Sequence, residues 1–544
     1  MLQFYDKFIT YLFSRRKDTW LFIFLVFTAL AFERFNFPRD AESRALIDSF
    51  PYYASITIWV AIYSLLSIVI TPIPSFLILS GSIYAIYKTS KLKLIATGEP
   101  LILGDISHIN HISIAAKYAP KFFIILILIS LISLFFYMIF RMLKMSNLKR
   151  LLAVVCVSSL ILSYQVISQL VSYYQQNGSL KYYAAVWQHN ANANGLLLHL
   201  IQTGQRPIPD KPTKAQAELF NQLAEKPSIN AATNTFIAIL CESCWHDDQL
   251  FSDEFDPLTK EGMIGMRGIS PIFGGGTVNS SFEILTGLPT LNGSVGGIIY
   301  QEYRDLLRKN TVTLPSILAE NDIHTESLHN HDGSFWFRNR VEPRLGFNQF
   351  FGLEDMPPPM NYPNGFPRDK VLFDFALDRI VASNNKNIFL HLATVHGHGP
   401  YDEVNGDNGH GSYISKMKAT VEDLVEFIQK IKRIKPDTVI LVYGDHKPAL
   451  PSLSPFLNES SHIRGDVPIW VLDSNQNRVS ALKHSIDGKP FYCFPSAISK
   501  IYYNFDYAVS NFTSDACTQY EPEQYLDLSA SIPGWVYTAA LLKL

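Results

Sequence analysis

Residues 438–446, Thr-Val-Ile-Leu-Val-Tyr-Gly-Asp-His, decide the fold of this chain. An apolar run of this length that stops at Gly444 is typical of a buried β-strand, and an Asp-His pair follows where the strand ends. A second run at 235–242, Thr-Phe-Ile-Ala-Ile-Leu-Cys-Glu, ends on a carboxylate in the same way. In an open α/β sheet the carboxyl ends of the strands form the ligand crevice, so these polar side chains are expected to meet there.

The rest of the C-terminal half fits the same kind of sheet. Further strand-like runs lie at 388–395 and 467–472, and residues 421–431 have the i, i+3, i+4 spacing of a helix with one buried face. Strands that alternate with helices indicate a mostly parallel sheet covered on both faces. We expect an α/β domain over 233–510, followed by a C-terminal extension over 511–544.

Residues 1–170 have the composition of a helical membrane domain. Charged residues make up only 17% of the chain, and most of the excess apolar residues lie in this part. Because about 20 apolar residues cross a bilayer, five spans are predicted, although a weak run can also be a buried soluble helix. The predicted spans are 19–36, 52–71, 73–90, 121–140 and 151–169.

The basic residues predict the orientation of these spans. Lys and Arg collect in the first 17 residues and in the connection 141–150, which carries no acidic residue, so both segments are expected in the cytoplasm. No small-residue cleavage site follows the first run, which favours an uncleaved anchor. Five spans then place everything after residue 170 outside, with linker helices over 171–232 leading to the α/β domain.

Charge and cysteine content exclude some functions. Lys and Arg total 46 against 48 for Asp and Glu, so nothing suggests a nucleic-acid partner. Five cysteines are too few for a disulfide scaffold, although one bridge is possible. Whether Cys493 and Cys517 pair is left open. Cys241-Glu-Ser-Cys244 has the C-x-x-C spacing of redox motifs and zinc sites. The chain contains no second pair with this spacing, so neither function is favoured.

A hydroxyl suited to nucleophilic attack follows a glycine run. Gly274-Gly-Gly precedes Thr277, and 278–287 has a helix-like pattern with Pro289 beyond it. Glycines allow a ligand to approach the backbone, and a helix start offers free N–H groups to an anion. Thr277 can attack phosphorus, bind a metal, or simply cap the helix. Ser280 and Ser281 compete with it but lie inside the predicted helix.

Four of these residues form a candidate metal site. Glu242, Thr277, Asp445 and His446 combine hard oxygen ligands with one imidazole, a set suited to one divalent ion, zinc or manganese. A buried carboxylate at the end of a core strand needs a partner, which a metal would supply. The alternative is a helix cap beside a surface histidine.

Two further clusters contain groups that suit a phosphorylated substrate. His329, Trp336 and Arg338 lie within ten residues, and Arg can form paired hydrogen bonds with a phosphate while Trp excludes water. His398, in His-Gly-His-Gly-Pro after another strand, could donate a proton to a leaving alcohol.

In this order, five spans followed by the Glu, Gly-Thr, His and Gly-Asp-His segments resemble the lipoteichoic acid synthase and phosphoethanolamine transferase group of the sulfatase (alkaline phosphatase) superfamily. The resemblance implies a sulfatase-like external or periplasmic domain on the bacterial cytoplasmic membrane. It implies metal binding by Glu242, Thr277, Asp445 and His446, with Thr277 also the nucleophile. It implies that the residues that hold the head group are His329, Trp336, Arg338 and His398. Residues 91–105 are similar to a Gly-x-Pro-Leu…Asp stretch of the family.

The chain departs from parts of this group. The disulfide-rich pattern of many phosphoethanolamine transferases is missing. Aryl sulfatases need Cys or Ser in a C/S-x-P-x-R signature, whereas Thr277 is followed by Val-Asn-Ser-Ser, without Pro or Arg. Sulfatase activity is therefore not expected.

The sequence thus predicts a membrane-bound transferase that acts without a nucleotide. It would move phosphoglycerol or phosphoethanolamine from a phospholipid donor to an external glycan or lipid-linked glycan through a phospho-threonine. One alternative is a membrane-anchored phosphodiesterase or phosphatase with two metals, for which His331, Asp332, His398 and His462 form no obvious second set. The other is a non-enzymatic sensor or scaffold.

Overall fold

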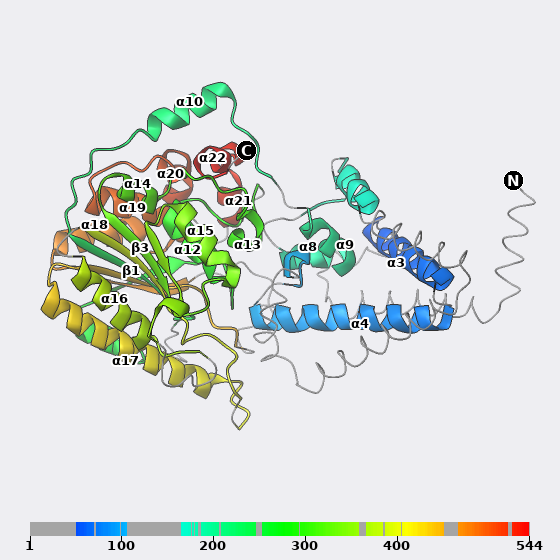
Figure 1. Cartoon of the computed structure of the whole chain (residues 1–544), viewed down its shortest axis with the longest axis horizontal. Coiled ribbons are helices and arrows are strands. Elements are labelled where there is room, and N and C mark those ends of the chain that lie inside the picture. Colours follow the sequence, from blue (N-terminus) through cyan, green and yellow to red (C-terminus); the bar gives the residue numbers. More distant parts are fainter. Residues whose placement is uncertain are drawn as a thin grey trace, which may run out of the picture. The chain divides into compact units, whose positions relative to one another are not determined.

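The computed structural model describes residues 50–105, 165–205 and 208–542, apart from gaps within these ranges (Figure 1). The gaps are 70–71, 98–99, 176, 179, 183–186, 246–252, 293, 358–365, 384–386, 404, 451–465 and 520–524. The chain divides near residue 206 into two compact units. The predicted spans 19–36 and 121–140, and most of 151–169, lie outside the described residues.

The first unit is helical. It contains α3 (Phe50–Val69), α4 (Pro72–Thr97), α8 (Trp187–Asn194) and α9 (Leu196–Thr203), and residues 165–175 are also helical. Helices α3 and α4 occupy the predicted spans 52–71 and 73–90, and Trp59, Ile83 and Leu196 share one buried cluster. Of the helices that the structure describes, none combines the length and the apolarity needed to cross a bilayer. The five-span membrane domain therefore stays a prediction.

The segment after α4 forms a closed loop within this unit. The Asp105 carboxylate pairs with Lys93 at 2.7 Å and accepts the Ile102 backbone N–H at 2.9 Å. The Leu103 N–H donates to the Thr203 hydroxyl of α9 at 3.3 Å. The Gly-x-Pro-Leu…Asp stretch therefore has a structural role here, in fixing the exit of α4.

The second unit is built on an eight-stranded sheet with the order β4-β3-β5-β1-β6-β7-β2-β8. Its central pairs are parallel, while β7 runs antiparallel to both β6 and β2. The strands are β1 (Thr235–Cys241), β2 (Ile264–Ile269), β3 (His324–His329), β4 (Gln349–Phe351), β5 (Ile388–Ala393), β6 (Val439–Gly444), β7 (Asp466–Leu472) and β8 (Lys489–Pro490). The mostly parallel α/β sheet predicted from the sequence is confirmed.

Helices cover both faces of this sheet because its central strands are apolar on both sides. Along β1, Phe236 and Leu240 belong to the core that includes α12 (Thr277–Thr286) and α19 (Phe494–Tyr502). Ile237 and Ile239 belong to the opposite core, formed with α16 (Lys370–Ala382) and α17 (His410–Ile434). Figure 1 shows α16 and α17 side by side below the sheet, with α12, α14 and α19 on its other side.

Shorter elements complete the unit. They are α10 (Lys214–Leu223), α11 (Asp256–Lys260), α13 (Ile299–Tyr303), α14 (Leu314–Glu320), α15 (Arg338–Val341), α18 (Gln476–Ile486), α20 (Ser510–Thr518), α21 (Tyr525–Ala530) and α22 (Gly534–Ala540). Val536 and Leu541 pack into the core of the sheet, and a disulfide joins Cys493 to Cys517. The described residues after 510 are therefore part of this fold, and the pairing of Cys493 with Cys517, left open by the sequence, is resolved.

Candidate metal and nucleophile site

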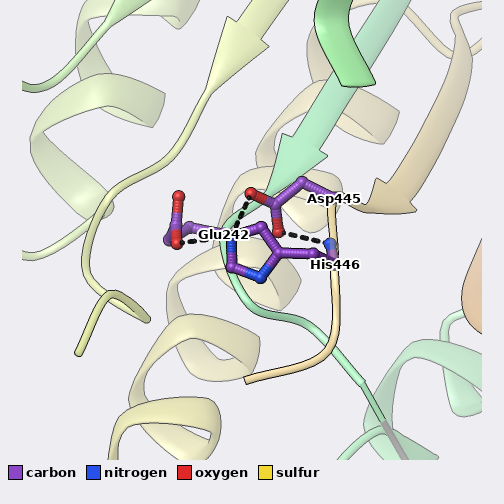
Figure 2. Close-up of side chains that lie close together, drawn as sticks. All are labelled: Glu242, Asp445 and His446. Atoms are coloured by element: carbon purple, nitrogen blue, oxygen red, sulfur yellow. Dashed lines mark hydrogen bonds and ion pairs between the residues drawn. The ribbon is translucent and has the colours of Figure 1, made fainter. Parts of the chain in front are cut away.

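Strand topology brings the predicted metal ligands together. In the register of β1 and β6, Cys241 lies opposite Gly444, so Glu242 and Asp445 leave their strands at the same level. Gly444 is required here, since a Cβ at this position would lie 2.1 Å from the Cys244 carbonyl oxygen. Figure 2 shows the Glu242, Asp445 and His446 side chains converging at this edge of the sheet.

The three side chains have the spacing of metal ligands. His446 Nε2 lies 3.2 Å from Asp445 Oδ2 and 3.5 Å from Glu242 Oε1. Tetrahedral ligands about 2.0–2.1 Å from a zinc ion are separated by about 3.3 Å. The ligand atoms of all three residues lie within 4.8 Å of one another. The spacing therefore fits one divalent ion.

The hydrogen bonds of the site also fit a cation. His446 Nδ1 lies 2.9 Å from the Lys447 carbonyl oxygen, which can only accept, so Nδ1 carries the proton of the neutral ring. The Nε2 lone pair then faces two carboxylates, and both Nε2 and Asp445 Oδ2 are buried without a hydrogen-bond partner. Three converging electron-pair donors in a buried place are suited to holding a positive ion between them.

Burial shifts the pKa values of all three groups towards their neutral forms. It raises the pKa of Asp445 to about 7. It also raises the pKa of Glu242, to which the negative charge of Asp445 adds, and it lowers the pKa of His446. Without a cation the site therefore resists being charged, and a divalent ion would compensate the two carboxylates.

Thr277 presents its hydroxyl to this cluster. Gly276 has φ +84° and is followed by Thr277 as the first residue of α12, while the Gly274 N–H donates to the Lys447 carbonyl at 3.1 Å. The glycine turn is thereby tied to the segment that follows β6. The Thr277 hydroxyl donates to Glu242 Oε2 at 3.1 Å. The four residues that the sequence predicted as ligands thus lie together.

The neighbouring serines have other partners. The Ser280 hydroxyl donates to the Asp445 carbonyl at 2.8 Å, and Ser270 binds the same oxygen. The Ser281 hydroxyl points back along α12 to the Thr277 carbonyl at 3.5 Å. Both serines of α12 thus bind backbone carbonyls, and of the three hydroxyls that follow the glycine turn Thr277 is the one that bonds to a side chain of the cluster.

His329 is the last residue of β3, and His398 lies in the loop that follows the neighbouring strand β5. His329 ends β3, its Nδ1 donates to the Ala393 carbonyl at 2.8 Å, and burial holds its pKa well below the usual value. His398 Nδ1 donates to the Gly399 carbonyl at 2.7 Å, and burial lowers its pKa, although the Glu242 charge opposes this. Both rings are therefore neutral, and each has an Nε2 lone pair.

Arg338, which the sequence predicts to bind a phosphate, lies in a buried ion pair. It is only 1% exposed, and its guanidinium pairs with Glu342 at 3.0 Å. The Tyr300 hydroxyl donates to the same Glu342 oxygen at 3.1 Å. Before it, the half-buried Trp336 and Phe337 both have left-handed backbones, φ +49° and +61°. Such strain in consecutive non-glycine residues is typical of a functional turn.

Two supporting residues were not identified from the sequence. The Thr394 hydroxyl, just after β5, accepts the Glu242 N–H at 2.8 Å. The buried Asp369 carboxylate accepts the N–H groups of Val395 and His396 at 3.0 and 3.1 Å and so shapes the loop before His398. Asp369 precedes α16, a position typical of a helix cap, and only this place before a helix could have drawn attention to it.

Comparison with known proteins agrees with this architecture. Residues 235–494 match the sulfatase family. A proposed cyclic beta-1,2-glucan modification protein of Rhizobium meliloti is 24% identical over 346 residues, which are 59% of this chain and 53% of the relative. Lipoteichoic acid synthase 1 of Bacillus subtilis is 30% identical over 149 residues, 25% of this chain and 23% of the relative. The chain thus spans about half of the first relative and about a quarter of the second.

Among solved structures, the lipooligosaccharide phosphoethanolamine transferase A of Neisseria meningitidis is similar with a TM-score of 0.47 and 12% identity, over 89% of this chain and 95% of that chain. The strands that end on Glu242 and Asp445 both lie inside the residues that match the sulfatase family. Residues 235–494 therefore resemble the sulfatase family, and shorter stretches of the chain are similar to lipoteichoic acid synthases.

Proposed function

We propose that this protein transfers a phospholipid head group, phosphoglycerol or phosphoethanolamine, to an external glycan or lipid-linked glycan. The observation that carries the proposal is the buried cluster of Glu242, Asp445 and His446 with the Thr277 hydroxyl bonded into it. The relatives named as a lipoteichoic acid synthase and a glucan modification protein support an acceptor of this kind.

One divalent ion, manganese or zinc, would be held by Glu242, Thr277, Asp445 and His446. When bound, it would lower the pKa of a hydroxyl and offset negative charge on the phosphoryl group. Both metals accept this mixture of oxygen and nitrogen ligands.

The proposed first step forms a phospho-threonine. The Thr277 oxygen attacks the donor phosphorus, the bond between phosphorus and the diacylglycerol oxygen breaks, and diacylglycerol leaves. The Thr277 proton passes first to Glu242 Oε2, its hydrogen-bond partner at 3.1 Å, and leaves on the diacylglycerol hydroxyl.

In the proposed second step an acceptor hydroxyl attacks the phosphorus, the bond between phosphorus and the Thr277 oxygen breaks, and the proton lost by the acceptor finally restores the Thr277 hydroxyl. His398 suits the removal of the acceptor proton, because its neutral ring has Nδ1 protonated and Nε2 free to accept. This role is the reverse of the proton donor suggested by the sequence, since burial disfavours the imidazolium form that a donor needs. Two half-reactions of this kind give ping-pong kinetics.

The head-group pocket in this proposal is formed by His329, Trp336, Arg338 and His398. Arg338 uses Nη1 on Glu342, while its Nε is buried without a partner. A donor thus remains for a phosphate oxygen. The neutral His329 Nε2 would accept a hydrogen bond from the hydroxyl or ammonium part of the head group.

The disulfides support an external location for this domain. Cys241 bonds to Cys244 and Cys493 to Cys517, and structural disulfides persist in oxidising compartments such as the periplasm or the cell surface. An external site would face a lipid donor in the outer leaflet and a glycan acceptor, and it would not meet cytoplasmic nucleotides.

The donor test separates the two head groups. Purified protein is incubated with phosphatidylglycerol or with phosphatidylethanolamine in mixed vesicles that contain zinc or manganese, and diacylglycerol is measured. Release from one lipid, and none with Thr277→Ala, is the expected result. If neither lipid yields diacylglycerol even with a glycan acceptor present, the lipid-donor proposal is wrong.

In the alternative function, a phosphodiesterase or phosphatase, water is the acceptor and a second metal site is expected. Among the described residues, one group of His, Cys, Asp and Glu side chains has metal-binding spacing, and it is the cluster already described. A metal analysis that finds two ions per chain would favour the phosphodiesterase or phosphatase.

A further inference from the structure

A disulfide encloses one of the proposed metal ligands. Cys241 is the last residue of β1 and bonds to Cys244, so the closed ring contains only Glu242 and Ser243 between the two cysteines. Both cysteines are buried. A catalytic thiol must be reachable by its partner, so this pair does not fit an exchange catalyst, and its location calls for another role.

The enclosed turn sets the orientation of two ligands. Ser243 has φ +57°, a left-handed conformation that is uncommon outside glycine. In this conformation its N–H donates to Asp445 Oδ1 at 2.7 Å, and its hydroxyl donates to Glu242 Oε1 at 3.0 Å. Asp445 Oδ2 is left without a hydrogen bond and lies beside His446. Together with the His446 N–H, which donates to the same Oδ1 at 2.9 Å, the turn therefore leaves Oδ2 as the Asp445 oxygen offered to a cation.

The surroundings of the turn leave little room for another backbone path. The Cys241 carbonyl accepts the N–H groups of Cys244 and Asp445, and the Tyr413 hydroxyl of α17 donates to the Ser243 carbonyl at 2.9 Å. The Cys244 carbonyl lies close against Gly444, and the Glu242 carbonyl lies close against Gly397. A turn that relaxed away from this shape would move both Glu242 and the N–H that holds Asp445.

We propose that the Cys241–Cys244 disulfide is a positioning element of the metal site, which holds the Glu242–Ser243 turn in its metal-binding shape. The inference rests on the proposed metal site at Glu242, Asp445 and His446. Closing a four-residue turn removes alternative backbone states from the metal-free protein, so less order has to be created when the ion binds. Partners that orient metal ligands contribute about 10–100-fold to metal affinity, and an effect of that size is expected here.

The coupling must also act in reverse. If the disulfide strengthens metal binding, bound metal makes the disulfide harder to reduce by the same factor. A water-soluble trialkylphosphine is a suitable reductant: the phosphine is oxidised to its oxide, water supplies the oxygen and two protons, and two thiols form. Zinc should protect the Cys241–Cys244 bond and leave the Cys493–Cys517 bond unaffected.

The test uses the full chain, with zinc affinity measured by competition with a fluorescent chelator. The variant Cys241→Ala/Cys244→Ala should bind zinc at least about tenfold more weakly than wild type. The matched control Cys493→Ala/Cys517→Ala removes the other disulfide of the described domain and should bind zinc like wild type. Alkylation followed by mass spectrometry then reports how fast each bond of the wild-type protein is reduced, with and without zinc.

Each outcome is decisive. If wild-type protein binds no zinc or manganese, the proposed metal site is wrong, which is a separate failure from that of the disulfide proposal. If wild type binds zinc, but loss of the Cys241–Cys244 bond leaves the affinity unchanged and zinc does not slow its reduction, the positioning role is overturned. Should the alanine variant fail to fold, the effect of zinc on the reduction of the Cys241–Cys244 bond in the wild-type protein decides the question alone.

Discussion

Three hydroxyls lie in the five residues that follow the glycine turn, and the structure separates their roles. Thr277 donates to Glu242, whereas Ser280 binds the Asp445 carbonyl and Ser281 binds the Thr277 carbonyl. We expect Thr277→Ala to abolish diacylglycerol release without unfolding the protein, because it removes one hydroxyl and one methyl group. Ser281→Ala is the matched control and should keep most of the activity. Full activity of Thr277→Ala would remove Thr277 from the mechanism.

The charges of the metal ligands predict how metal binding depends on pH. Burial raises the pKa of Asp445 to about 7, and that of Glu242 is also raised. A carboxyl whose pKa is higher in the folded than in the unfolded protein stabilises the metal-free fold at low pH. This contribution to the free energy of unfolding is lost as the pH rises through about 7. A metal ion must displace these protons, so the increase in melting temperature caused by zinc should grow between about pH 5.5 and 7.5. An increase that is the same across this range, measured by differential scanning fluorimetry, would contradict the assignment.

Arg338 and Glu342 form a buried ion pair, and their substitutions can separate a structural role from a binding role. Glu342→Ala leaves a buried guanidinium without its partner and should destabilise the protein by about 3–5 kcal/mol. Replacing both residues, Arg338→Met with Glu342→Leu, should restore most of the stability because apolar side chains can fill the same space. If Arg338 also binds the head group, the double variant regains its melting temperature but not its rate of diacylglycerol release. Recovery of both would limit Arg338 to a structural role.

At the scale of secondary structure, the sequence predicts the strands that carry the metal ligands and misses the two strands at each end of the sheet. β1 and β6 are continuous apolar runs because both of their faces are covered by helices. β3 reads His-Thr-Glu-Ser-Leu-His, and β2 contains two glycines, so neither shows an apolar pattern although both belong to the sheet. Their places depend on neighbours that are far away in the sequence.

The same reasoning explains which parts of the site could be predicted. Glu242, Asp445 and His446 follow strands whose carboxyl ends share an edge, and that rule needs only the strand positions. The contacts of Ser243, Thr394 and Asp369 join segments that are between about 25 and 200 residues apart, so no local pattern contains them. The burial of Arg338 depends on its ion pair with Glu342, one helical turn later. In the sequence, an Arg and a Glu with i, i+4 spacing indicate an exposed ion pair as readily as a buried one.

Two glycines at the strand ends should be essential for the metal site. A Cβ would lie 2.1 Å from the Cys244 carbonyl at Gly444, and 2.1 Å from the Glu242 carbonyl at Gly397. Because backbone atoms cannot move aside cheaply, Gly444→Ala and Gly397→Ala should displace the ligands and weaken zinc binding. Gly265→Ala on β2 is the control, since its Cβ would meet only Trp470 side-chain atoms at 3.9 Å. Equal zinc affinity in all three variants, measured by chelator competition, would count against this geometry.

At the scale of the whole molecule, composition and structure give different kinds of information about the N-terminal half. The sequence predicts five spans from apolar runs, and the structure describes two of these segments as the helices α3 and α4. Neither these helices nor the others that the structure describes have the length and apolarity of a span. The sheet domain could be predicted more fully, since its strand ends, glycine turn and helix periodicity all point to the same α/β architecture.

The orientation of the chain is the prediction on which the proposed substrates depend. The disulfides of the sheet domain favour an oxidising compartment, and the basic connection at 141–150 favours the cytoplasm. A reporter fused after residue 180 should therefore be active only outside the cytoplasm, and one fused near Asn147 only inside. The two fusions control for expression, because each one is expected to be active in the compartment where the other is inactive. The reverse pattern would place the site beside cytoplasmic nucleotides, where a phospholipid would no longer be the natural donor.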